Sequence, residues 1–193
     1  MSDPCRSLAL LIATLLLVAA SRTAAAQPAP DPKLPLKTIL VVTPEFCATK
    51  LSKGSWATIK ESFEVGKIAC VELEPALKGT FSTLSVVAAP PATADLKDTQ
   101  LILIPRFVDV AATTTMSAFS DREMNVFLEW TAKDAAGKTV WIETVEGTSK
   151  HHMGNLFTHS KNLKLIVNDS VKDVAAKSAT KMSSSAELRK LTP

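Results

Sequence analysis

The sequence lacks an excess of charge of one sign. It has 22 basic and 19 acidic residues, which gives a formal net charge of +3, and the basic residues are scattered along the chain. Proteins that hold nucleic acid through its phosphates carry a basic patch or stripe. The composition therefore gives no indication of a nucleic-acid partner, and we interpret the charges as a solvated surface of mixed sign.

Catalytic motifs are also missing. The sequence contains no G-x-S-x-G elbow. The segment Ala136–Thr139 looks like the end of a phosphate-binding loop, but Ala132 stands where that motif requires glycine, and a strand is expected to follow instead of a helix. No serine or cysteine is tied by its sequence position to a histidine base. We therefore predict that the protein is not an enzyme and has no catalytic residues.

The hydrophobic run Leu8–Ala20 is shorter than the about 20 residues that a membrane-spanning helix needs. Arg6 precedes it and the small residues Ala24–Ala26 follow it, which is the pattern of a secretory signal peptide over residues 1–26, cut after Ala26. An uncleaved anchor is the alternative. Cys5 precedes the run and no cysteine stands at the cleavage site, so we expect a periplasmic or secreted protein that meets the membrane only through its signal.

Cysteine is scarce, and after cleavage only Cys47 and Cys70 remain. An exported protein meets an oxidising compartment, so a disulfide between them is chemically permitted. It would close a loop of about 23 residues and add about 3 kcal/mol of stability. Two unpaired buried thiols are the alternative, because the geometry of a disulfide is strict.

A proline-rich stretch follows the predicted signal peptide. Four prolines between residues 27 and 36 exclude a helix and favour an extended linker. Hydrophobic residues are 46% and charged residues 21% of the whole sequence, a balance typical of a chain that folds around a core. Residues 37–193 are therefore expected to form a single domain.

A β-hairpin over residues 123–147 is the clearest structural signal. Apolar and polar residues alternate on both sides of Asp134–Gly137, and Asp and Gly suit a turn. The period of two places Val126, Leu128 and Trp130 on one face of a sheet. We expect this hairpin to form the centre of the sheet.

Further strands are expected in β-branched, apolar stretches, namely Lys37–Thr43, Thr83–Val87 and Thr99–Val110. Pro105 cannot donate to a ladder, so the last of these strands is expected to end there or to carry Pro105 at a sheet edge.

Two amphipathic helices complete the expected fold. Ser62 is expected to cap the first, and Pro75 to kink or break it near Leu73. The second, capped by Thr158 or Ser160, is expected to run for about five turns. Its apolar stripe consists of Leu163, Ile166, Val167, Val171, Val174 and Met182. The elements predict an α+β two-layer sandwich, with a mixed sheet and both helices packed on one face.

The three histidines, His151, His152 and His159, lie close together in the sequence. Neutral imidazole is a good zinc ligand, so these residues are the candidates for a metal site. Adjacent residues of an extended chain point to opposite sides, however, and the spacing matches no zinc signature. We therefore expect no metal site and interpret the segment as a solvated loop.

Glutamates and unpaired segments are the remaining candidates. Glu129, Glu143 and Glu146 alternate with apolar residues and are expected on the outer face of the hairpin, where they would not act as paired catalytic carboxylates. The segments Thr113–Phe119 and His151–Phe157 have no obvious packing partner. They are the candidates for contact with a partner.

The order of elements resembles that of bacterial envelope α/β accessory proteins: the YajG-type lipoproteins and the N-terminal region of the curli-secretion lipoprotein. Pel-polysaccharide export lipoproteins and activators of peptidoglycan synthases look similar. The resemblance is carried by Ile39–Val42, Val65–Lys67, Leu73–Phe81, Val86–Val87, Leu101–Ile104, the Trp130–Trp141 hairpin and Ser185–Leu188. This chain departs from the pattern in having no lipidation cysteine after its signal.

The resemblance implies a non-enzymatic component of the cell envelope that binds a protein or polymer partner and needs no cofactor. Such binding would use a sheet edge or a docked helix, because strand edges offer unpaired backbone groups. The alternative function is binding of a small ligand or a metal through the segment from His151 to His159.

Overall fold

The computed structural model describes residues 33–54, 60–92, 96, 98–113, 121–152 and 159–192. The predicted signal peptide and its cleavage site lie outside these residues. Residues Pro32–Pro193 form one compact unit. The described elements, in chain order, are β1 (Leu34–Val41), α2 (Pro44–Cys47), β2 (Leu51–Gly54), β3 (Lys60–Phe63), α3 (Val65–Leu77), β4 (Phe81–Val87), β5 (Leu101–Thr113), β6 (Asp121–Lys133), β7 (Thr139–His152), α4 (His159–Ser184) and α5 (Ala186–Arg189).

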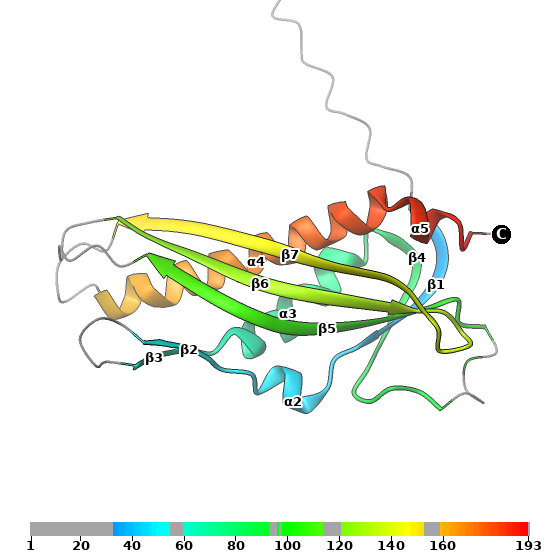
Figure 1. Ribbon diagram of the computed structural model, residues 1–193, viewed down its shortest axis with the longest axis horizontal. Coiled ribbons are helices and arrows are strands. Elements are labelled where there is room, and N and C mark those ends of the chain that lie inside the picture. Colours follow the sequence, from blue (N-terminus) through cyan, green and yellow to red (C-terminus); the bar gives the residue numbers. More distant parts are fainter. Residues whose placement is uncertain are drawn as a thin grey trace, which may run out of the picture. The chain divides into compact units, whose positions relative to one another are not determined.

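A mixed sheet is the frame of the fold. Within the described residues it has five strands in the order β4-β1-β5-β6-β7, and β2 and β3 form a separate antiparallel pair (Figure 1). β4 and β5 run parallel to β1, and the connection from β1 to β4 includes α3. The pairs β5–β6 and β6–β7 are antiparallel. The predicted mixed α+β sheet is confirmed.

β6 and β7 form the predicted hairpin, and its turn has the predicted chemistry. Asp134 Oδ1 accepts hydrogen bonds from the amides of Ala136 and Lys138, each 2.9 Å long, and Gly137 adopts a φ of 80°. The prediction that the hairpin is central was wrong in one respect, because β7 is an edge strand and β5 occupies the middle of the sheet. Alternation along a strand identifies its two faces but says nothing about its neighbours.

Two helices, α3 and α4, cover one face of the sheet (Figure 1). Along β6 every second side chain faces them: Met124, Val126, Leu128 and Trp130 are fully buried, whereas the residues between them are partly exposed. Trp130 Nε1 donates a hydrogen bond of 2.8 Å to Ser178 Oγ on α4. The predicted two-layer arrangement and the predicted buried face are therefore confirmed.

Most strands extend further than predicted, and two of the extensions, in β1 and β5, bear on prolines or on the predicted linker. β1 begins at Leu34, so residues 34–36 of the predicted linker belong to the sheet, and Leu34 and Leu36 are buried. β5 continues past Pro105 to Thr113. The pairing of β5 with β1 ends at Leu103. Pro105 therefore lies beyond the parallel ladder, where no backbone amide is needed for pairing with β1.

The first long helix, α3, begins after Glu64. Ser62 belongs to β3 and does not cap the helix, contrary to the prediction. The helix does not break near Leu73, because α3 runs through Pro75, and the predicted kink stays a prediction. Pro75 leaves the carbonyl of Val71 without its helical donor, but Val71 is 67% exposed, so water can satisfy that carbonyl.

The second long helix, α4, has 26 residues and is longer than the predicted five turns. Ser160 lies inside it and is not its cap, and Thr158 lies outside the described residues. The predicted apolar stripe is buried or partly buried against the sheet and α3: Leu163, Ile166, Val167, Val171, Val174 and Met182. Ser185–Leu188 was predicted to be the end of this helix. In the structure Ser185 caps a separate short helix, α5.

A disulfide joins α2 to α3. Cys47 and Cys70 are bonded, with their Cα atoms 5.7 Å apart, so the alternative of two unpaired thiols does not hold. The two helices touch closely beside this bond. A Cβ added at Gly66 would collide with the carbonyl oxygen of Phe46 and lie 2.8 Å from the amide nitrogen of Thr49. The disulfide and Gly66 together fix the start of α3 against α2.

Replacing both cysteines with serine is expected to lower the free energy of unfolding by about 3 kcal/mol, because the unfolded chain regains the freedom of the loop between positions 47 and 70. Urea denaturation followed by far-UV circular dichroism measures this difference. Reduced wild-type protein serves as the control and should match the double variant. A loss below about 1 kcal/mol in both samples would contradict the prediction.

Candidate functional site

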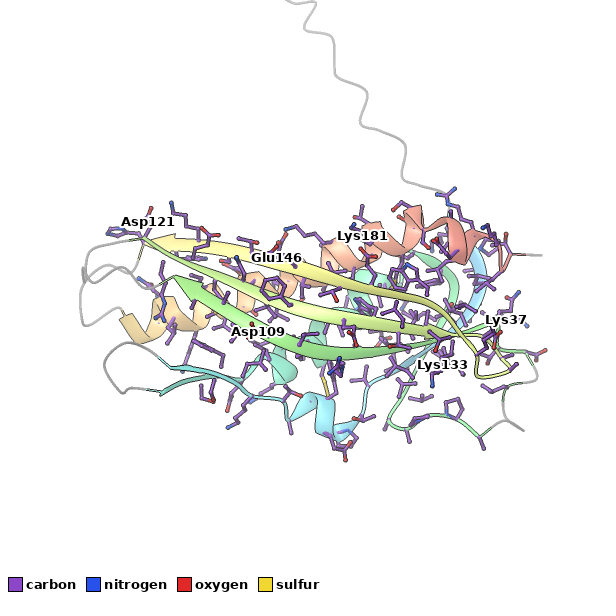
Figure 2. The ribbon with its side chains drawn as sticks, viewed as in Figure 1. Lys37, Asp109, Asp121, Lys133, Glu146 and Lys181 are labelled. Atoms are coloured by element: carbon purple, nitrogen blue, oxygen red, sulfur yellow. A yellow bond between two sulfur atoms is a disulfide. The ribbon has the colours of Figure 1, made fainter. Side chains whose placement is uncertain are left out.

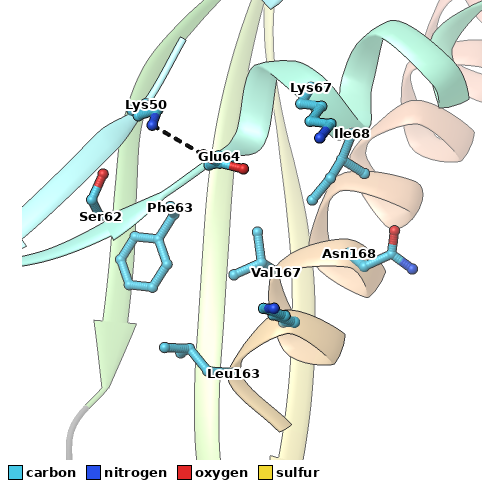
Figure 3. A pocket seen from close by; sticks show the side chains of 10 residues that line it. Lys50, Ser62, Phe63, Glu64, Lys67, Ile68, Leu163, Val167 and Asn168 are labelled. Carbon is cyan, nitrogen blue, oxygen red and sulfur yellow. Dashed lines mark ion pairs between the residues drawn. The ribbon is translucent and has the colours of Figure 1, made fainter. Parts of the chain in front are cut away.

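A groove of about 780 Å³ lies between β3, the start of α3 and the first half of α4 (Figure 3). Its volume is within the range of about 300–1,000 Å³ that is usual for small-molecule sites. It is lined by Lys50, Ser62, Phe63, Glu64, Lys67, Ile68, Leu163, Lys164, Val167 and Asn168.

The floor of the groove is apolar. Phe63 at the end of β3 is 3% exposed and Val167 on α4 is 5% exposed, and Ile68 and Leu163 are partly buried beside them. Figure 3 shows these four side chains pointing toward the same space from three different elements. The four carbon side chains form a surface that can take an apolar ligand group.

The rim of the groove is positively charged. Lys50 Nζ lies 3.0 Å from Glu64 Oε1, as the dashed line in Figure 3 marks. This hydrogen bond and charge, together with the charges of Lys67 and Lys164, hold the pKa of Glu64 below its ordinary value. Neither Lys67 nor Lys164 forms an ion pair with another described residue. After Glu64 has neutralised Lys50, two ammonium groups remain available to an anion.

The edge of β4 is a second candidate site. In the described sheet β4 pairs on one side with β1, and Ser82, Thr83, Ser85 and Val86 are exposed. The strand contains no charged residue and no proline. Proteins commonly use charged residues and proline to protect an edge strand from pairing with another chain. The β4 edge therefore has a surface on which a further strand could pair.

Part of the opposite edge of the sheet, around Gly147 and Thr148 on β7, is in contact with α4. The amide of Thr148 on β7 donates a hydrogen bond of 2.7 Å to Asp173 Oδ2 on this helix. A Cβ added at Gly147 would collide with the carbonyl oxygen of Ser170 and lie 2.5 Å from the amide nitrogen of Val174. The backbones of β7 and α4 are thus in direct contact, and this part of the edge offers no comparable space.

The predicted histidine loop is partly strand and partly helix. His151 and His152 are the last residues of β7, and His159 is the first residue of α4. His151 Nε2 donates to Asp169 Oδ2 at 2.8 Å, whereas His152 Nδ1 donates to Asp121 Oδ1 at 3.1 Å. The two neighbouring imidazoles have different partners on different elements, as alternation along a strand requires.

These contacts also bear on the metal hypothesis. In the part of the chain that the structure describes, no group of three or more potential metal ligands is found. The side chain of His159 lies outside that part. The hydrogen bonds of His152 and Lys150 hold the pKa of Asp121 below its ordinary value, so this carboxylate is already engaged. The alternative of a metal site that uses all three histidines stays a prediction.

The predicted glutamates divide between the two faces of the hairpin. Glu129 forms an ion pair of 2.9 Å with Arg106, and Figure 2 shows Glu146 projecting from β7. Glu143 is an exception to the prediction that all three lie on the outer face. It pairs in register with Trp130 on the helix side and lies 3.2 Å from Lys181 Nζ on α4. The three carboxylates are therefore not brought together.

The predicted partner-binding segments lie largely outside the described residues. Of Thr113–Phe119 the structure describes the backbone of Thr113 at the end of β5, and of His151–Phe157 it describes the two histidines of β7. Ala136–Thr139 forms the hairpin turn and the start of β7, as predicted, and does not open a helix.

No helix among the described residues combines the length and the apolar character needed to cross a bilayer.

No protein-family model and no curated protein matches this sequence. The fold has a precedent in Xanthomonas campestris. A protein from that organism, described by the family model DUF330, covers 80% of this chain and 89% of its own, with a TM-score of 0.53 and 6% identity. At this identity the likeness shows a shared fold alone.

Two other bacterial structures are more distant in shape. A minor lipoprotein from Acinetobacter baumannii covers 79% of this chain and 93% of its own, with a TM-score of 0.49 and 11% identity. The match to the PelC dodecamer from Paraburkholderia phytofirmans covers 76% of this chain and 92% of the PelC chain, with a TM-score of 0.37 and 14% identity. The similarity to the YajG-type and curli-secretion lipoproteins stays a prediction.

Sequence reasoning missed the groove completely. Its lysines come from three separate segments and show no cluster along the chain. Ser62 was assigned to a helix cap but lines the groove from β3. The one usable signal is the apolar stripe of α4, because Leu163 and Val167 belong to it and also line the groove.

Proposed function

We propose that the protein is an exported, non-enzymatic accessory protein of the bacterial cell envelope that binds an extended segment of a partner protein at the edge of β4. The observation that carries the proposal is the unprotected edge of this strand, which has exposed residues and no charge or proline. The predicted signal peptide supports the export of the chain.

Strand addition would give the partner two kinds of contact. The outward amides and carbonyls of β4 would supply main-chain hydrogen bonds, which carry little sequence preference. Leu84 and Val87 belong to apolar clusters on opposite faces of the sheet, where they could contact alternate side chains of the added strand. The expected partner segment is therefore extended, with apolar residues on both faces.

Photo-crosslinking in the producing bacterium tests the proposal. A photo-reactive residue at Ser85 is expected to give a discrete adduct with one envelope protein, whereas the same residue at Lys172 on α4 should give none. A charge at the edge should prevent strand pairing, so a second photo-reactive site at Ser82 is expected to lose its adduct in a Ser85→Lys background. Ala176→Lys adds the same charge on the exposed side of α4 and should leave the adduct unchanged.

Two results would count against the proposal. One is the absence of a discrete adduct at both Ser82 and Ser85, with the protein correctly exported. The other is an adduct that survives Ser85→Lys at the wild-type level, because a contact that tolerates this charge does not depend on strand pairing. Circular dichroism of each variant checks that the fold is intact.

A further inference from the structure

We infer that the groove between α3 and α4 binds a single-chain anionic amphiphile, a molecule with one acyl-type tail and a carboxylate or phosphate head. The site lies among the ends of β3, α3 and α4 and uses none of the residues of β4. The inference is therefore independent of partner binding at the β4 edge, and either can fail without the other.

The tail would occupy the floor of the groove. Phe63, Ile68, Leu163 and Val167 are carbon side chains from three elements that converge on one space (Figure 3). Covering this apolar surface with an apolar chain removes it from water, which favours binding. The tail would lie over Phe63 and Val167, which form the most deeply buried part of the floor.

The head would lie at the rim between Lys67 and Lys164. Both lysines line the groove, and the charges of both act on Glu64 at its rim. Glu64 is engaged with Lys50 at 3.0 Å and leaves the other two lysines without an ion-pair partner among the described residues. An anion there would gain two charge-assisted contacts, which are stronger than neutral hydrogen bonds.

Among the described residues, the groove offers few polar side chains to an extended peptide. Apart from the charged residues, the described lining has the hydroxyl of Ser62 and the amide of Asn168. A peptide backbone brings a donor and an acceptor with almost every residue, and each one buried without a partner is costly. An acyl tail has no such groups, so its chemistry fits the floor better.

Isothermal titration calorimetry with three ten-carbon probes tests the inference on the purified protein. Decanoate and decyl phosphate, used below their critical micelle concentrations, are expected to bind one molecule per chain. Decanol, which has the same tail and no charge, is expected to bind at least about tenfold more weakly, because it lacks the two charged contacts. Inorganic phosphate should not compete, because it has no tail.

Matched variants separate the head from the tail. Lys67→Gln with Lys164→Gln is expected to weaken decanoate binding at least about tenfold and to leave decanol binding unchanged. Lys172→Gln with Lys181→Gln removes the same charge from α4 outside the groove and should change neither. Leu163→Gln is expected to weaken all three probes.

Several outcomes would overturn the inference. Equal affinity for decanoate and decanol would show that the lysines of the rim do not bind the head group. Wild-type affinity for decanoate in the Lys67→Gln, Lys164→Gln variant would show the same. Competition by inorganic phosphate at matched concentration would show a simple anion site. Binding to anionic phospholipid vesicles without binding to monomeric decanoate would show a surface contact and not an occupied groove.

Discussion

Replacing Gly147 with alanine is expected to lower the free energy of unfolding by about 3 kcal/mol, a large share of the about 5–15 kcal/mol available to a domain. The added Cβ would collide with the carbonyl oxygen of Ser170 and lie 2.6 Å from the Cβ of Val174. Backbone cannot rotate away as a side chain can, so the strand or α4 must shift. A shift would also stretch the hydrogen bond of 2.7 Å from the Thr148 amide to Asp173.

Gly79→Ala is the matched control for this prediction, because nothing lies within 4 Å of a Cβ at that position. Its effect is expected to stay within about 0.5 kcal/mol of zero. Urea denaturation of the two variants and the wild type, followed by circular dichroism, gives the comparison. If the two alanine variants unfold at the same denaturant concentration, the close contact between β7 and α4 is not as tight as described.

Much of the architecture could be predicted from local patterns. The alternation around Trp130, the Asp and Gly of the turn and the stripe of α4 each reflect a period set by backbone geometry, and all three were confirmed. The position of the hairpin could not be predicted in this way. Which strand becomes an edge depends on pairing between segments far apart in the sequence, and no local period encodes it.

Short elements were also beyond the reach of the sequence. α2 has four residues and is stabilised at its start by Thr43, whose side-chain oxygen accepts from the amide of Phe46 at 3.1 Å. Thr43, Pro44 and Glu45 are residues typical of a helix start, but four residues are too few to show the helical period that identifies a longer helix. The disulfide was permitted by the sequence but selected by the three-dimensional approach of α2 and α3, which Gly66 makes possible.

The candidate groove depends on the same long-range packing. Phe63 and Val167 are about 100 positions apart in the sequence and meet because α4 packs beside β3 and α3. Each lysine of the rim looks like an ordinary surface charge when the chain is read in order. The site is visible only in the folded chain, where Lys50, Lys67 and Lys164 act on Glu64 and line a groove with an apolar floor.

Replacing Trp130 with alanine is expected to cost about 3–5 kcal/mol of unfolding free energy. Its side chain is fully buried between the sheet and α4, and its ring nitrogen donates to Ser178 Oγ at 2.8 Å. Trp130→Phe keeps most of the apolar area, and Ser178 still donates to the carbonyl of Val174 at 2.6 Å, so this variant should lose about 1–2 kcal/mol.

Ile142→Ala is the control for both variants of Trp130, because Ile142 lies on the adjacent strand but is 60% exposed. Its effect should stay within about 0.5 kcal/mol of zero. Chemical denaturation followed by far-UV circular dichroism avoids the change in fluorescence that loss of a tryptophan causes. Equal costs for Trp130→Ala and Ile142→Ala would mean that the helices do not cover this face of the sheet, and both the hydrophobic core and the groove beside it would then have to be placed differently.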